Sequence, residues 1–259
     1  MSGKAGISWP VQELTSDPVA KFFQPGSKLS WHYNWNKNWS ELLPDTTPGL
    51  KIDAEFVPML WKPDFLHNAD KLQEGWSMLL GYNEPDHNDP SVASRCSAVD
   101  AARSWKEVAK LRRQDPAIKL VSPAVASDKG WLKDFFSCLE PDEMPDILAI
   151  HIYTTTFDSF RASAEEYYSM FRLPIMITEF AVQSFSRNVP GPQSQQQVHD
   201  FMGQTTKWLD ETGYIMRYCW FGAVRDPSNL HGVHPYNRLM DEQGNVTPLG
   251  HQYIAGGHD

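Results

Sequence analysis

The sequence predicts an α/β protein that folds as a single, compact (β/α)8 TIM barrel with some shortened helices. The chain has 259 residues, close to the roughly 250 of a typical barrel of this kind. Eight apolar, partly β-branched runs recur along it with helical or loop segments between them. The runs are nearly continuous rather than alternating, which is typical of parallel strands covered on both faces.

The expected strands follow one another along the whole chain. We place them at residues 5–9, 28–33, 55–61, 77–81, 119–123, 147–153, 174–179 and 215–221. A doubly wound open sheet is the alternative, but no glycine-rich phosphate loop follows the first run. No break in composition and no repeat divides the chain, so we expect one domain over residues 1–259.

Helices are expected over residues 97–113, 131–139, 159–171 and 195–209. The first begins with Ser97 followed three residues later by Asp100, close to a capping box, and continues with an apolar stripe. The connection over residues 36–50 is rich in Pro, Asn and Asp. With Trp39 and Pro44 inside it, this segment resembles a binding loop more than a helix.

Charge and composition exclude several kinds of partner. The formal net charge is −9 and the 23 Lys and Arg residues are scattered, so we expect neither nucleic acid nor an anionic membrane as partner. No apolar stretch approaches the roughly 20 residues of a membrane span. Ten tryptophans are unusual in an acidic chain, and they suggest that several line a groove.

Compartment signals in the sequence are weak. The first six residues lack the apolar core of a secretory signal. Two glycosylation sequons begin at Asn38 and Asn245, which suits a secreted protein. The chain is therefore expected either to be intracellular or to be a mature secreted domain. Three cysteines allow at most one disulfide.

Two strand-like runs end on glutamates. Residues 77–81 lead into Asn83 and Glu84, and residues 174–179 end on Glu179. In a barrel, the carboxyl ends of all strands meet at one face, so these two carboxylates are expected to share a cleft. A proton donor paired with a nucleophile or base is the arrangement that glycoside hydrolysis needs. The competing interpretation is that each glutamate forms a structural ion pair.

Further candidates for the site stand at other strand ends, where aromatic faces can stack on sugar rings and polar groups can bind hydroxyls. For His151, Trp31 and Trp61 the competing interpretation is a place in the core. Asp86 and His87 follow Glu84 and could bind a metal together with it. Nothing elsewhere supplies a second cluster of ligands at metal-binding spacing, so we expect neither a metal nor a cofactor. The candidate substrate-binding residues are Asn83, Trp31, His32, Tyr33, Asn34, Trp35, Trp61, His151, Tyr153 and Trp220.

These segments resemble a known family. Asn83-Glu84-Pro85 together with Glu179 resembles the pattern of clan A retaining glycoside hydrolases. More narrowly, segments 80–86, 121–125, 150–153 and 177–181 are similar to glycoside hydrolase family 128, whose catalytic core is of the Asl1-like type. Segment 31–35 matches an aromatic–Tyr-Asn-Trp signature of that family. Its members are mostly fungal and bacterial β-1,3-glucanases with a compact barrel.

The resemblance implies a role for each matching residue. Glu84 would be the acid/base and Glu179 the nucleophile, and Asn83 would bond the sugar 2-hydroxyl. His151 and Tyr153 would hold or tune Glu179. The resemblance also implies that Trp31, Trp35 and Trp220 are platforms for sugar rings.

The expected activity is cleavage of laminarin-type β-1,3-glucan by a double-displacement mechanism, with internal bonds as the target. A β-glucan oligosaccharide-binding protein with little or no turnover is the alternative, and a β-1,4-mannan or xylan is an alternative substrate. We expect a monomer that is extracellular or associated with the cell wall, with a cytoplasmic protein as the alternative. Segments 189–192 and 226–235 are where a wall closing one end of the groove is expected.

Overall fold

The computed structural model describes residues 3–10, 20–38, 54–63 and 76–258. Every run predicted as a strand overlaps a strand within these residues. The expected binding loop around Trp39 and Pro44 lies outside them. The strands are β1 (Ala5–Ser8), β2 (Trp31–Tyr33), β3 (Glu55–Phe56), β4 (Met78–Leu80), β5 (Lys119–Val121), β6 (Leu148–Thr154), β7 (Ile175–Val182) and β8 (Ile215–Trp220).

The strands form a ring of parallel neighbours. Six of them pair in the order β3-β2-β1-β8-β7-β6, and β4 pairs with β5. Parallel bridges join Met59, just after β3, to Leu80 of β4, and Val121 of β5 to Ile147, just before β6. The Leu60 backbone N–H donates to the Leu80 carbonyl at 2.9 Å, and the Ser122 N–H donates to the Ile147 carbonyl at 2.9 Å. These links connect the two sheets into the (β/α)8 barrel that the sequence predicts.

Helices cover the outside of this ring. They are α2 (Ala98–Gln114), α3 (Lys129–Ser137), α4 (Phe157–Phe171), α5 (Gln195–Glu211) and α6 (Pro248–Ile254). The Ser97 hydroxyl accepts from the Asp100 N–H at 3.1 Å, so the predicted N-terminal cap of α2 is confirmed. The nine-residue α3 is one of the short helices. No helix among the described residues is both long and apolar enough to span a bilayer.

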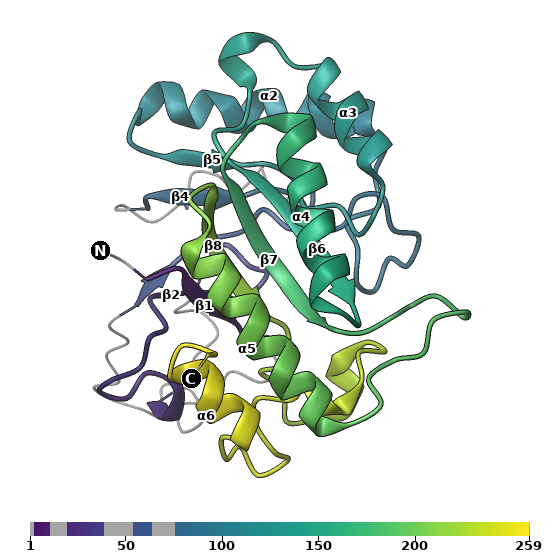
Figure 1. Cartoon of the computed structure of the whole chain (residues 1–259). Coiled ribbons are helices and arrows are strands. Elements are labelled where there is room, and N and C mark those ends of the chain that lie inside the picture. Colours follow the sequence, from purple (N-terminus) through teal and green to yellow (C-terminus); the bar gives the residue numbers. More distant parts are fainter. Residues whose placement is uncertain (1–2, 11–19, 39–53, 64–75, 259) are drawn as a thin grey trace.

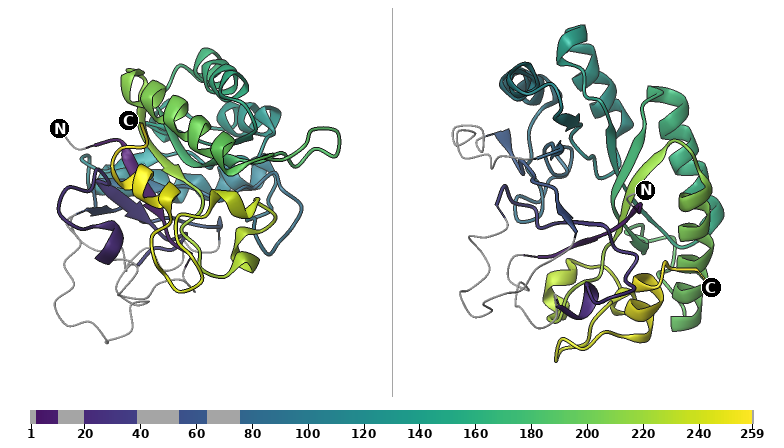
Figure 2. Two further views of the ribbon diagram at one scale, coloured as in Figure 1. Left: turned by 60° about the horizontal axis from the view of Figure 1, so that its bottom comes forward. Right: turned by 90° about the vertical axis from the view of Figure 1, so that its left-hand side faces the viewer.

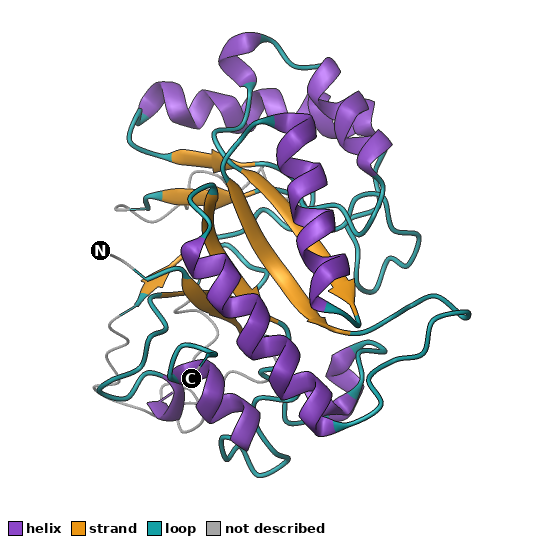
Figure 3. Ribbon diagram, in the orientation of Figure 1, coloured by secondary structure: helices purple, strands orange, loops and turns teal. Residues whose placement is uncertain are grey.

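The helices are arranged in two groups. Figure 1 shows α4 and α5 lying across β6, β7 and β8, while α2 lies beside β5 and α3 packs against α2. The views in Figure 2 show α4 and α5 together on one flank of the sheet, with the C-terminal segment next to them. In Figure 3 the strands occupy the middle of the molecule and the helices its outside.

Strand parity divides the core into two layers. Side chains of alternate strand residues point to opposite faces. On β2, Trp31 and Tyr33 point into the barrel, where they join a cluster with Met176 and Cys219. The outward-pointing residues join the larger cluster between sheet and helices, to which Trp220 of β8 belongs. All three cysteines are free, and Cys219 is fully buried.

The barrel interior leaves no room beside Gly6. A Cβ atom on Gly6 would overlap the indole of Trp31, its partner on β2. We expect Gly6→Ala to lower the free energy of unfolding by about 3 kcal/mol, at the upper end of the cost of overpacking a core. Urea denaturation of the purified variant measures this.

Gly213→Ala is the matched control. A Cβ atom on Gly213 would meet nothing within 4 Å, and this glycine is not in the left-handed region. The control should be neutral or slightly more stable than the wild type, because alanine restricts the unfolded chain. Equal stability of the two variants would contradict the tight packing at Gly6.

Candidate active site

Glu84 and Glu179 lie in one open cavity of about 820 Å³ at the carboxyl ends of the strands. Glu179 is on β7, and Glu84 is four residues beyond β4. Among the residues that the sequence nominates, the cavity is lined by Asn34, Trp35, Trp61, Asn83, Glu84, Tyr153 and Glu179. The two predicted carboxylates therefore meet, as the closure of the barrel requires.

The backbone holds Glu84 in an uncommon conformation. Its φ is 41°, in the left-handed region, which non-glycine residues enter only when surrounding structure fixes them. The Glu84 N–H donates to the Ala124 carbonyl at 2.8 Å. Two residues later, the Asp86 carboxylate accepts from the N–H groups of Ala126, Ser127 and Asp128 at 2.7–3.0 Å. These bonds tie the segment after β4 to the segment after β5 and so fix the direction of Glu84.

The two carboxylates are close to each other. Their nearest oxygens lie within 4.8 Å, and His151 of β6 lies against both. His151 Nδ1 is 2.7 Å from Glu84 Oε1, and its Nε2 is 3.5 Å from Glu179 Oε1. A separation of about 5–5.5 Å is typical of retaining glycosidases, and about 6.5–9.5 Å of inverting ones. The short gap between the nearest oxygens agrees with the retaining spacing.

Glu179 is buried and accepts two hydrogen bonds from side chains. Trp35 Nε1 donates to its Oε1 at 2.9 Å, and the Tyr153 hydroxyl donates to its Oε2 at 2.6 Å. Burial raises the pKa of the Glu179 carboxyl, and the charge of Glu84 adds to this. His151 and the two donors pull that pKa back. The pKa of Glu179 remains above its ordinary value, and the donors favour the ionised form that a nucleophile needs.

His151 is enclosed by protein, with no exposed side-chain surface. Burial lowers the pKa of its imidazole, but the carboxylates of Glu179 and Glu84 raise it more, so the net direction is upward. A protonated His151 donates through Nδ1 to Glu84 and presents positive charge to Glu179. The side chain therefore links the two carboxylates without contacting solvent.

Glu84, His151 and Glu179 are also the group, within the described ranges, whose ligand atoms lie close enough to share a metal ion. Hydrogen bonds already engage those atoms: Glu84 with His151, and both oxygens of Glu179 with Trp35 and Tyr153. Such mutual bonding favours an acid pair over a metal centre. That the protein needs no metal or other cofactor stays a prediction.

Three of the residues predicted to contact substrate do not lie at the cavity. Two of them point to the outside of the barrel, and the third lies at its opposite end. Trp220 points outward, is fully buried, and its Nε1 donates to the Asn237 carbonyl. His32 also points outward, between the rings of Phe23 and Phe56, and burial lowers its pKa to about 3. Trp31 points inward but lies at the opposite end of the barrel, where its Nε1 donates to the Lys4 carbonyl.

Tyr33 and Asn34 support the site from behind. The Tyr33 hydroxyl donates to the Thr178 carbonyl at 2.9 Å, and its buried ring lies 4.9 Å from that of Trp35. The direct sugar contact expected of Tyr33 is therefore wrong, because the ring lies beneath Trp35. The Asn34 amide donates to the Asn38 carbonyl at 3.2 Å, so it orders the loop that carries Trp35.

The cavity also contains residues that the sequence did not reveal. Phe185, in the connection after β7, is 61% exposed, and its ring lies 5.4 Å from that of Tyr153. Residues 229–231 and Val233 line the same cavity and fall within the segment expected to form a wall. The other expected wall, 189–192, is not among the lining residues. An aromatic residue shortly after the predicted strand that contains Glu179 was the available signal for Phe185.

Comparison with known proteins supports the same assignment. A family model described as the glycosyl hydrolase catalytic core matches residues 6–253. A crystal structure of a family 128 (subgroup V) exo-β-1,3-glucanase from Cryptococcus neoformans is 60% identical, with a TM-score of 0.93 over 99% of this chain and 100% of that one. No curated protein sequence matches the chain.

Two more distant crystal structures are also similar. One is a subgroup VI exo-β-1,3-glucanase from Aureobasidium namibiae, 26% identical with a TM-score of 0.79 over 98% of this chain and 97% of that one. The other is a subgroup II endo-β-1,3-glucanase from Sorangium cellulosum, 25% identical with a TM-score of 0.78 over 98% and 99%. The family match over nearly the whole chain, the 60% identity and the carboxylate pair lead to one conclusion: the chain belongs to the glycosyl hydrolases, in glycoside hydrolase family 128.

Proposed function

We propose that the protein is a retaining exo-β-1,3-glucanase in which Glu179 is the nucleophile and Glu84 the acid/base. The observation that carries this proposal is the pair of carboxylate oxygens within 4.8 Å of each other. This separation leaves room for a sugar carbon but not for an inverting water molecule. The 60% identical enzyme from Cryptococcus neoformans, an exo-β-1,3-glucanase, supports the choice of substrate.

In the first step, a Glu179 oxygen attacks the anomeric carbon while the glycosidic C–O bond breaks. The Glu84 carboxyl gives its proton to the departing oxygen, which leaves a glycosyl ester on Glu179. In the second step, water attacks the same carbon, Glu84 takes a proton from the water, and the ester bond breaks. Two inversions give net retention.

Three side chains are placed to assist this chemistry. Tyr153 and Trp35 hold the Glu179 carboxylate by hydrogen bonds to its two oxygens. Asn83 Oδ1 is buried and has no hydrogen-bond partner among the described residues, while its amide N–H donates to the Val92 carbonyl. Because Asn83 lines the cavity, we propose that this unpaired acceptor receives a sugar hydroxyl when substrate binds.

The exo mode replaces the expectation of internal cleavage. Residues 229–231 and Val233, together with the exposed ring of Phe185, stand along the cavity. We propose that these residues form a wall that blocks a chain from passing through and so favours its end. The Aureobasidium namibiae exo-β-1,3-glucanase supports this choice, although at 26% identity.

Secretion and a monomeric state are also part of the proposal. Asn245 of one sequon is exposed, which suits glycosylation of an exported protein. Asn38 of the other sequon is buried, so we propose that only Asn245 carries a glycan.

The two glutamates are distinguished by external azide. With an activated aryl β-glucoside, whose phenolate leaves without a proton donor, Glu84→Ala should form the glycosyl-enzyme, and azide should then give a β-glucosyl azide. Glu179→Ala should instead give an α-glucosyl azide, because azide replaces the nucleophile directly. Proton NMR of the products reads the anomeric configuration.

Wild-type enzyme on laminarin is the control, and its first product should be the β anomer. An α anomer as first product would exclude the retaining assignment. No release of reducing sugar from laminarin would instead favour a glucan-binding protein without turnover.

Exo action is tested on laminarin and on laminarihexaose labelled at the reducing end. Because the wall admits only a chain end, one short product should accumulate from the start while the viscosity of the polymer falls slowly. Chromatography of early time points and viscometry measure the two quantities. Early formation of many intermediate lengths would show internal cleavage.

Tyr153→Phe tests the hydrogen bond to Glu179. Removing this donor raises the pKa of Glu179, and the nucleophile must be ionised, so the acidic limb of the pH–activity profile should move to higher pH. Loss of a hydrogen bond to a charged group should lower kcat roughly ten- to a hundredfold. Tyr168→Phe, at a half-buried position of α4 outside the catalytic cavity, should leave both unchanged. An unshifted acidic limb in Tyr153→Phe would contradict this role.

A further inference from the structure

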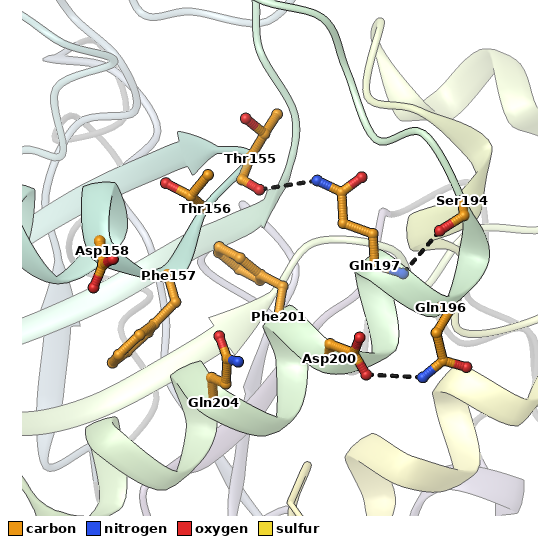
Figure 4. A pocket seen from close by; sticks show the side chains of 10 residues that line it. All are labelled: Thr155, Thr156, Phe157, Asp158, Ser194, Gln196, Gln197, Asp200, Phe201 and Gln204. Carbon is orange, nitrogen blue, oxygen red and sulfur yellow. Dashed lines mark hydrogen bonds between the residues drawn. The ribbon is translucent and has the colours of Figure 1, made fainter.

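A second cavity lies on the flank of the barrel, outside the active site. Its volume is about 780 Å³, close to that of the catalytic cavity. It is bounded on one side by the start of α4 and on the other by α5 (Figure 4). No catalytic carboxylate lines it.

Polar residues of α5 form one wall. Gln196, Asp200 and Gln204 are four residues apart and therefore share one face of the helix. The Gln196 side-chain amide donates to the Asp200 carboxylate at 2.8 Å (Figure 4). This pairing leaves the Gln196 carbonyl and the second oxygen of Asp200 as acceptors, while Gln204 offers both a donor and an acceptor.

The opposite wall is the connection from β6 to α4. It presents the side chains of Thr155, Thr156 and Phe157. Gln197 links the two walls, since its side-chain amide donates to the Thr155 carbonyl at 3.1 Å. On its own wall, the Gln197 backbone N–H donates to Ser194 Oγ at 3.1 Å, which caps α5.

The chemistry of the lining favours a neutral, hydroxyl-rich ligand. None of the ten lining residues is Lys, Arg or His, so an anionic ligand has no charge partner there. Amides, hydroxyls and carboxylates both donate to and accept from sugar hydroxyls, and Phe157 adds a half-buried aromatic ring. Arg161 lies over this ring at 5.5 Å and ion-pairs with Asp158, and the Trp208 ring is 6.5 Å from that of Phe157.

We propose that this cavity is a second saccharide-binding site, which holds a stretch of β-1,3-glucan chain while the active site cleaves a chain end. The identity of the ligand rests on the proposed function. Both cavities lie at the carboxyl end of β6 and β7, since Tyr153 and Thr155 line one each. The connection from β7 to α5 also contributes to both, with Phe185 in the first and Ser194 in the second.

The test uses the full chain with Asp200→Ala and Gln204→Ala combined. Both positions are exposed on a helix, where alanine favours the helical state, so the fold should be kept. Lys207→Ala with Glu211→Ala is the matched control, at the same spacing on α5 but outside the cavity. Each pair is made in the wild type and in Glu179→Ala, and thermal unfolding checks the fold of every variant.

Binding to insoluble β-1,3-glucan is measured in the Glu179→Ala background by sedimentation. The Asp200/Gln204 pair should weaken binding at least about fivefold, as expected for the loss of one or more hydrogen bonds. In the catalytically intact background, the rate on laminaritriose should stay unchanged, because a short soluble substrate needs only the active site. The rate on the insoluble polymer should fall together with binding. The control pair should change none of these.

Two results would overturn the second site. One is equal binding of the Asp200/Gln204 pair and the control pair to the polymer. The other is an equal loss of activity on laminaritriose and on the polymer, which would indicate a general defect. Failure of the proposed function is seen separately, as an absence of laminarin hydrolysis by the wild type, and the sedimentation assay reports on the second site in either case.

Discussion

The buried carboxylate of Glu179 is the constraint on which the rest of the site depends. A charge removed from water is costly unless donors or opposite charge replace the lost hydration. Here the donors are Trp35, after β2, and Tyr153, on β6, while His151 supplies the charge. Because these groups come from separate parts of the chain, Glu179 is held only when the barrel has assembled around it.

The same requirement explains the backbone strain at the cavity. Trp35 and Glu84 have φ values of 56° and 41°, so two bulky residues stand in the left-handed region within one site. Such residues cost roughly 1–3 kcal/mol each and persist where neighbours fix them. The bond from Trp35 to Glu179 fixes the first. The three backbone bonds accepted by Asp86 anchor the segment that carries the second. The left-handed backbone directs the side chains of Trp35 and Glu84 into the cavity. An extended backbone at the same positions would direct them elsewhere.

The strands and the meeting of Glu84 and Glu179 in one cavity were predictable from sequence, while the positions of several aromatic side chains were not. Apolar runs identify buried strands, and a charge at the end of a run must lie at the rim, which locates Glu84 and Glu179. The predictions for Trp220 and His32 failed because neighbouring residues of a strand point to opposite faces of the sheet. Which residues point into the barrel depends on how the strand pairs with its neighbours, and the sequence of the strand alone does not show this. Trp31 does point into the barrel, but it lies at the end of the barrel opposite to the catalytic cavity. Phe185 lies in a loop, and the spacing of apolar residues in a sequence does not predict the path of a loop.

The proposed second site bears on a difficulty that the proposed exo action would meet on a solid polymer. An enzyme that cleaves only chain ends must find them, and ends are rare in an insoluble glucan. A site that holds the middle of a chain makes the second encounter intramolecular and raises the effective concentration of nearby ends. The gain is largest when the distance between the two sites is fixed and one glucan chain can span it. The connection between β7 and α5 joins the two sites along the chain, since it supplies Phe185 to one cavity and Ser194 to the other. Its Ser194 also caps the helix that carries the polar wall of the second cavity, so the order of α5 and the spacing of the two sites depend on the same few residues.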